Sequence, residues 1–177
     1  MQVGLRKRFS QPRKRINMMS FKATPRTMFE RFTEEARRVL FFARAKTTER
    51  DGDAIIEQDL LGGIVLVKPQ IFSRFAKPLT GMLTESAHDF ISRLVEDRSS
   101  WEARAAKEIR FSAAVQMTLT RAGEEADQLG HDAIQPEHLL LGILRDDSSD
   151  VSRTLNDAGV TLHEARRIMG TDLNGQS

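Results

Sequence analysis

The sequence predicts an all-α protein that contains two copies of one helical unit. The first observation is an internal repeat: residues 32–74 align without a gap with 111–153, and twelve of the 43 positions are identical, where chance gives about two or three. The second observation is that apolar residues follow the helical period in both copies. The third is that aromatic residues make up 6% of the chain and Tyr is absent, which argues against a large β-sandwich.

In the first copy, a helix is expected to begin after Thr33, because Thr is a favoured N-cap residue. A second helix is expected from Glu57 to the stop at Pro69, followed by shorter helices over 71–76 and 84–95. The apolar stripe of the helix after Thr33 consists of Ala36, Val39, Leu40 and Ala43.

The second copy shows the same plan. Ser112 is the expected N-cap of its first helix, and Gly130 is the expected stop. A further helix starts near Pro136, a short one covers 151–157, and Thr161 caps the last. The offset aligns Leu40 with Leu119, so we expect both to be buried in equivalent places.

The charge is unevenly distributed along the chain. Residues 1–27 hold eight basic and no acidic residues, which leaves 19 basic against 25 acidic residues in 28–177. The arm has too few apolar residues to fold alone, so disorder is expected; it also resembles an organellar transit peptide. The expected division of the chain is as follows: a basic extension at 1–27, one domain at 28–170 (repeat one 28–96, connector 97–110, repeat two 111–170), and a tail at 171–177.

Several functions are not supported by the sequence. It holds no cysteine, no apolar run of about 18 residues, and no G-x-x-x-x-G-K-[ST] phosphate loop. We therefore expect no thiol chemistry, no membrane span and no ATP binding. His131 and His138 are seven residues apart and lack a third ligand, so packing and local hydrogen bonds are expected in place of a metal. No catalytic constellation is present, so an enzyme is not expected, and no cofactor.

The second copy carries a recognisable motif. Phe111-Ser112, with Val115, Leu119 and Ala122, is followed by Leu129-Gly130-His131-Asp132-Ala133-Ile134-Gln135-Pro136-Glu137-His138-Leu139-Leu140-Leu141-Gly142-Ile143-Leu144. This pattern closely resembles the Clp ATPase N-terminal repeat, and Met28-Phe29-Glu30-Arg31-Phe32-Thr33-Glu34 resembles the opening of ClpC-type chaperones. The resemblance implies eight helices in two four-helix repeats related by a pseudo-twofold axis. Because the sequence has no phosphate loop, we expect a stand-alone N-domain without the AAA+ modules of Clp ATPases.

The resemblance also implies two pockets for phosphorylated arginine, each with a hydroxyl at the start of the first helix and a Glu in the second. Repeat two keeps Ser112 and Glu137, whereas repeat one keeps Thr33 but has Gln58 where Glu137 is expected. Its neighbours, Glu57 and Asp59, are possible substitutes. The simpler interpretation is that the hydroxyls are N-caps and that Glu137 is a first-turn acid favoured by the helix dipole.

We therefore expect a non-enzymatic interaction module of a Clp chaperone–protease system. The expected partners are Clp ATPase or protease subunits, adaptors or substrate proteins, in the cytoplasm or, if 1–27 is a transit peptide, in an organelle. The alternative is a nucleic-acid-associated helical protein that uses the Arg-rich arm. Phe29, Phe32, Phe41 and Phe42 could form an exposed apolar patch for a partner, or could pack against the connector and Trp101.

Overall fold

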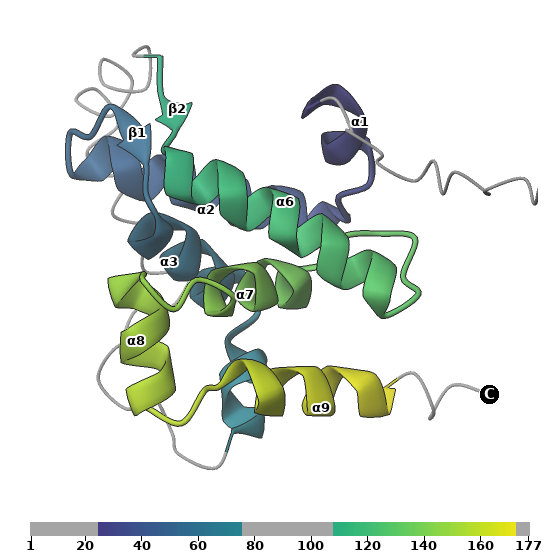
Figure 1. The fold of residues 1–177 in the computed structure, drawn as a ribbon. Helices are drawn as coiled ribbons and strands as arrows, with labels where there is room; N and C mark the ends of the chain where they lie inside the picture. Colours follow the sequence, from purple (N-terminus) through teal and green to yellow (C-terminus); the bar gives the residue numbers. More distant parts are fainter. Residues whose placement is uncertain (1–24, 76–107, 173–177) are drawn as a thin grey trace, which may run out of the picture.

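The computed structural model describes residues 25–75 and 108–172, and these are almost entirely helical (Figure 1). The fold class predicted from the sequence is therefore confirmed. The elements of the first copy are α1 (Pro25–Glu30), α2 (Glu34–Glu49), β1 (Ala54–Ile55), α3 (Glu57–Val67) and the 3₁₀ helix η1 (Pro69–Arg74). Those of the second are β2 (Arg110–Phe111), α6 (Ala113–Gln128), α7 (Pro136–Leu144), α8 (Asp150–Asp157) and α9 (Leu162–Asp172).

Some expectations concern residues outside this description. Most of the basic arm, the helix expected at 84–95, Trp101 and the tail from 173 lie outside the described residues. Helix α1 begins at Pro25, inside the stretch predicted to be disordered. Proline fits the first position of a helix because its missing N–H would have no partner there.

Short backbone pairings join the two copies. Strand β1 is parallel to β2, with Ala54 opposite Arg110 and Ile55 opposite Phe111. An isolated parallel bridge joins Phe32 to Ile134. The two pairings are equivalent under the internal repeat, because at the offset of 79 Phe32 corresponds to Phe111 and Ile55 corresponds to Ile134. The segment before the first helix of each copy thus pairs with the segment before the second helix of the other.

Within each copy two helices cross at a glycine: α2 with α3 in the first copy, and α6 with α7 in the second. A Cβ atom on Gly63 of α3 would lie 2.4 Å from the carbonyl oxygen of Val39, and one on Gly142 of α7 would lie 2.4 Å from that of Thr118. Both distances are far below van der Waals contact, so only glycine allows the helices to approach this closely. The equivalence of the two crossings shows that the repeat seen in the sequence is a repeat in packing.

One hydrophobic core extends across both copies, with Ile64 from α3 and Leu140 from α7 fully buried in it. Matching residues of the two copies are not always buried to the same extent. Leu119 is 3% exposed, whereas Leu40 is only half-buried and packs against the edge of the core. The expected equivalence of these residues is therefore wrong: the buried face of α2 is centred on Val39 and Ala43, and Leu40 lies to one side of it.

Local signals at the helix ends agree with the sequence. Gly130 and Gly159 have φ values of +72° and +86°, in the left-handed region that ends helices. Asp51, the counterpart of Gly130 in the first copy, has the same kind of backbone with φ of +56°. The Thr161 hydroxyl accepts a 3.3 Å hydrogen bond from the Glu164 amide, as expected of an N-cap. None of the described helices is long and apolar enough to cross a membrane.

The different burial of the two leucines predicts different costs of truncation. Leu119→Ala should lower the free energy of unfolding by about 2–5 kcal/mol, because it removes buried methyl groups and leaves a cavity. Leu40→Ala should cost clearly less, because water already reaches part of that side chain. Urea unfolding followed by far-UV circular dichroism measures both values, and equal losses would contradict the unequal burial.

The glycine crossings provide a second test. Gly142→Ala should destabilise the domain by at least about 1–3 kcal/mol, because the new methyl group forces α6 and α7 apart. Gly123→Ala, also in the interior of a helix, is the control: the nearest atom to its Cβ would be Ile134 Cδ1, at 3.7 Å. That variant should gain about 0.5–1 kcal/mol from helix propensity. Equal effects on the unfolding midpoint would refute the close crossing.

Candidate functional site

The two hydroxyl residues predicted as N-caps are N-caps in the structure. Thr33 Oγ1 accepts from the Ala36 amide at 3.2 Å at the start of α2. Ser112 Oγ accepts from the Val115 amide at the same distance at the start of α6. Both side chains are half-buried. The capping interpretation is therefore correct, and each hydroxyl still has a proton to donate.

The structure groups the predicted site residues differently from the sequence. The Thr33 amide donates to the Ile134 carbonyl at 3.0 Å, and Ile134 lies three residues before Glu137 of α7. The Ser112 amide donates to the Ile55 carbonyl at 3.0 Å, three residues before Gln58 of α3. Each cap therefore adjoins the second helix of the other copy. The expected pairing within one repeat, with Ser112 beside Glu137, is corrected to a pairing across the repeats.

Glu137 lies in an ion-pair network that the sequence did not indicate. Its Oε1 is 2.8 Å from Nζ of Lys68, the residue that follows α3. The same ammonium lies 3.1 Å from Oε2 of Glu35, two residues after Thr33. Burial by itself would lower the pKa of Lys68, but hydrogen bonds to Glu137 and then to Glu35 outweigh it and raise the pKa. The lysine therefore stays charged between two carboxylates.

The second carboxylate oxygen of Glu137, Oε2, lacks a hydrogen-bond partner among the described residues. This oxygen is buried, and the side chain as a whole is only 15% exposed. Leaving a buried carboxylate oxygen unsatisfied costs free energy. Because Oε1 already binds Lys68, a guanidinium could bind both oxygens only by displacing the lysine or by sharing the carboxylate with it.

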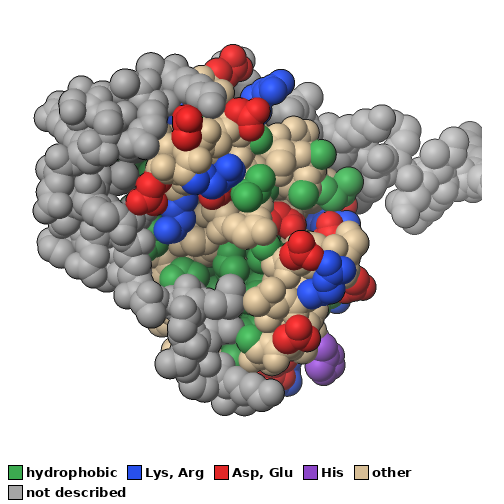
Figure 2. All heavy atoms as spheres, turned by 90° about the vertical axis from the view of Figure 1, so that its left-hand side faces the viewer, with side chains coloured by type: hydrophobic (Ala, Val, Ile, Leu, Met, Phe, Trp, Pro, Cys, Tyr) green, Lys and Arg blue, Asp and Glu red, His purple; other side chains and the backbone are tan. Residues whose placement is uncertain are grey.

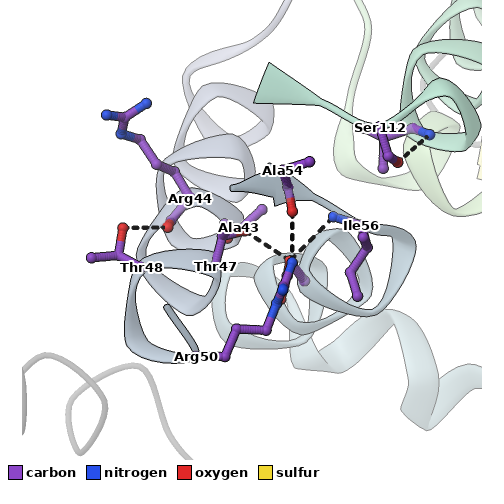
Figure 3. Close-up of polar contacts among 10 residues, drawn as sticks. Ala43, Arg44, Thr47, Thr48, Arg50, Ala54, Ile56 and Ser112 are labelled. Atoms are coloured by element: carbon purple, nitrogen blue, oxygen red, sulfur yellow. Dashed lines mark hydrogen bonds and ion pairs between the residues drawn. The ribbon is translucent and has the colours of Figure 1, made fainter. Parts of the chain in front are cut away.

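The position in α3 that matches Glu137 has no carboxylate, and its two acidic neighbours are engaged in the protein interior. Gln58 is exposed. Asp59, the next residue, is buried and accepts from Thr47 Oγ1 at 2.7 Å, from the Ile56 amide at 3.1 Å and from Arg50 NH2 at 2.8 Å. Figure 3 labels these three donors, Thr47, Ile56 and Arg50. Asp59 therefore serves as an internal anchor for Arg50 and cannot substitute for the missing Glu.

Glu57 is also occupied. Its carboxylate is 7% exposed and accepts hydrogen bonds from the hydroxyls of Thr118 on α6, at 2.9 Å, and of Ser149, the N-cap of α8. These bonds connect the first copy to the second through the protein interior. Neither acidic neighbour of Gln58 can therefore provide the charge that position 58 lacks.

The two histidines contact each other. His138 Nδ1 accepts from the Gln135 amide at 2.9 Å, and its Nε2 lies 2.7 Å from Nδ1 of His131. Because Nδ1 of His138 accepts a hydrogen bond, its Nε2 carries the proton and donates a hydrogen bond to Nδ1 of His131. Burial, followed by the nearby His131, lowers the pKa of His138 to about 4. Within 25–75 and 108–172, no group of three or more ligating side chains could hold a metal ion.

The four phenylalanines do not form one exposed patch. Phe41 is 53% exposed, but Phe32 and Phe42 are buried at 3% and 2%, and Phe29 is half-buried and stacks on Phe111. The face shown in Figure 2 mixes acidic, basic and apolar side chains, without a field of one sign. This face therefore lacks the basic stripe typical of nucleic-acid-binding proteins; residues 1–24 of the basic arm lie outside the described residues.

Fold and site together define the class of this protein: an all-α double-repeat domain whose copies share one core and exchange their short pairing segments. The sequence model of the family described as "Clp repeat (R) N-terminal domain" matches residues 31–158. The chain belongs to this family.

Relatives and solved structures agree with this assignment. Chaperone protein ClpC of pea (Pisum sativum) chloroplasts is 32% identical over 135 residues, which cover 76% of this chain and 14% of the relative. The negative regulator of genetic competence ClpC/MecB of Bacillus subtilis is 29% identical over 154 residues, which cover 85% of this chain and 18% of the relative. The chain thus spans less than a fifth of the length of either protein.

The crystal structure of the N-terminal domain of the chaperone ClpD from Arabidopsis thaliana is similar in fold. It has a TM-score of 0.56 and 22% identity, and the match covers 82% of this chain and 99% of that domain. A structure from a study of a malarial protein secretion system has a TM-score of 0.59 and 18% identity, with 80% of this chain and 93% of that one covered.

The histidine pair predicts a loss of stability in mild acid. The folded-state pKa of His138, about 4, lies below the ordinary value of 6.5, so the unfolded chain takes up the proton first as the pH falls. The stabilisation is therefore complete above pH 6.5 and is lost as the pH falls toward 4. From pH 7 to 5 the free energy of unfolding should fall by about 2 kcal/mol through this residue.

Urea unfolding at the two pH values measures this loss. In His138→Gln the difference between pH 7 and pH 5 should shrink by that amount, because the titrating ring is gone. His163→Gln is the control, since His163 is exposed on α9, and it should keep the full difference. An unchanged pH dependence in His138→Gln would show that the buried imidazole does not titrate as described.

Proposed function

We propose that this chain is a non-catalytic protein-interaction module of a Clp chaperone–protease system, which binds substrates, adaptors or Clp subunits. Membership in the Clp N-terminal repeat family supports this proposal. The named relatives with which it shares the family are ClpC chaperones and an N-terminal domain of ClpD. The folded part presents helix starts, caps and a buried carboxylate at one junction, which suits binding.

We further propose that the junction of α2 and α7 recognises phosphorylated arginine side chains. The observation that carries this proposal is the buried, unpartnered Oε2 of Glu137 beside the capped start of α2. A carboxylate can pair with the flat face of a guanidinium through two hydrogen bonds. The Thr33 hydroxyl and the first amides of α2 can receive the phosphate, because a helix N-terminus attracts anions.

The equivalent junction of α6 and α3 is expected to be the weaker site. There Ser112 supplies the hydroxyl, but Gln58 supplies a neutral amide in place of the carboxylate. An amide oxygen can accept a hydrogen bond from a guanidinium but lacks the charge that strengthens the pairing. The difference is on the order of 1–2 kcal/mol, or roughly tenfold in affinity.

Calorimetric titration of the full chain with phosphoarginine tests this proposal. One dominant site is expected; it should be lost in Glu137→Gln and retained in Gln58→Ala. Thr33→Ala should weaken it, whereas Ser112→Ala should not. These two variants are matched, because each loses one N-cap at a similar cost of about 1 kcal/mol in stability.

The variants also distinguish between groupings of the site. If Ser112→Ala weakened the dominant site and Thr33→Ala did not, the hydroxyl would belong to the same repeat as Glu137, against the backbone pairing. Two sites of equal affinity would refute the asymmetry. Absence of binding in the unmodified chain would leave Glu137 as a first-turn acid of α7 and refute phosphoarginine recognition.

A further inference from the structure

In the other copy Glu35 of the α2–α7 junction corresponds to Ala114 and Glu137 to Gln58, and Lys68 has no cationic counterpart either. The offset of 79 places Asp147 at the matching position, where the side chain is exposed. The fold therefore does not require a cation at the end of the second helix. In the first copy this cation nevertheless contacts two carboxylates from two other helices, Glu35 and Glu137.

The charges at the junction can be counted directly. Glu35 and Glu137 contribute two negative charges and Lys68 one positive charge, so the group carries a net charge of −1. Lys68 is 21% exposed and Glu137 15%, so water screens their interaction less than it screens a surface ion pair. Without the lysine, two carboxylates would lie close together beside the start of α2, and they would repel any phosphate.

We infer that Lys68 determines which ligand this site accepts, favouring a guanidinium with an attached phosphate over an unmodified arginine. This inference rests on the function proposed above. A plain guanidinium that binds both oxygens of Glu137 displaces the ammonium or shares the carboxylate with it, and it offers the ammonium no new partner. A phosphorylated guanidinium offers its phosphate to the displaced ammonium, so the ion pair with Glu137 is exchanged for another.

The side chain of Lys68 is suited to this exchange. A lysine ammonium is a compact charge on a flexible four-carbon stem, and it can turn toward a new partner without movement of the backbone. The backbone at Lys68 is held in place by its amide, which donates to the Ile64 carbonyl at 2.8 Å. The ammonium group of Lys68 can therefore move while its backbone stays in place. Lys68 acts on specificity, whereas Glu137 provides the binding carboxylate.

The test compares two ligands on two proteins by calorimetry: phosphoarginine and arginine, with the full chain and with Lys68→Met. The unmodified chain should prefer phosphoarginine. In Lys68→Met, phosphoarginine should bind more weakly and arginine more tightly, because the net charge of the junction falls to −2. The ratio of the two dissociation constants should therefore change by at least about tenfold, since a charged hydrogen bond to the phosphate is lost.

Two further variants control for charge and folding. Lys68→Arg keeps the positive charge and should keep the preference. Lys46→Met removes a lysine from the last turn of α2, at the opposite end of that helix from Glu35, and should leave the ratio unchanged. Thermal unfolding confirms that all variants are folded at the temperature of titration.

The outcomes separate the two proposals. If phosphoarginine binds, Glu137→Gln abolishes binding, and Lys68→Met leaves the preference unaltered, the role of Lys68 is refuted and the proposed function stands. If Lys68→Met and Lys46→Met change the ratio equally, the effect is one of overall charge and the role of Lys68 is likewise refuted. If neither ligand binds to either protein, the proposed function fails and the inference fails with it.

Discussion

The reciprocal backbone pairing between the copies is the constraint on which the rest of the structure depends. The amides of Thr33 and Ser112 donate to carbonyls of the opposite copy, at Ile134 and Ile55. Each bond ties the start of one copy's first helix to the segment before the other copy's second helix. Once these segments are paired, the helices they precede must lie side by side. The shared core and the junctions of the candidate site both follow from this arrangement.

The two copies stabilise the start of their second helix with different chemistry at matching positions. In the second copy His138 accepts the amide of Gln135 and is held by His131. In the first copy Asp59 accepts the amide of Ile56 and is held by Arg50. Both solutions satisfy an amide that has no partner within the helix. They differ in the charge of the acceptor, because burial lowers the pKa of His138 to about 4 and keeps its ring neutral near pH 7, whereas Asp59 forms an ion pair with Arg50.

At the candidate site, the two copies of the repeat differ in one residue that matters for binding. Where the second copy has Glu137, the first has Gln58, and the neighbouring acids Glu57 and Asp59 are engaged in the interior. Of the two matching positions 58 and 137, only Glu137 therefore offers a carboxylate to the proposed site. The positive charge of Lys68, which the other junction lacks, adds to this difference. A pseudo-symmetric fold thus carries a site whose electrostatics are not symmetric.

Features that depend on contacts between near neighbours could be predicted from the sequence. The N-caps at Thr33 and Ser112 and the helix stops at Gly130 and Gly159 depend on bonds and dihedral angles within a few residues. The fold class followed from helical periodicity and from the repeat, and the resemblance identified the residues of the candidate site, although not how they are grouped.

The tertiary structure alone decided three matters, each through residues far apart in the chain. It paired the caps across the copies, because the exchange of segments is a long-range contact that a repeat pattern does not specify. It buried Leu119 but left Leu40 half-exposed, because the neighbours of each helix differ although the two stripes match. It placed Lys68 on Glu137, which is 69 positions further along the chain, because the end of α3 meets the start of α7 only after both copies have folded together.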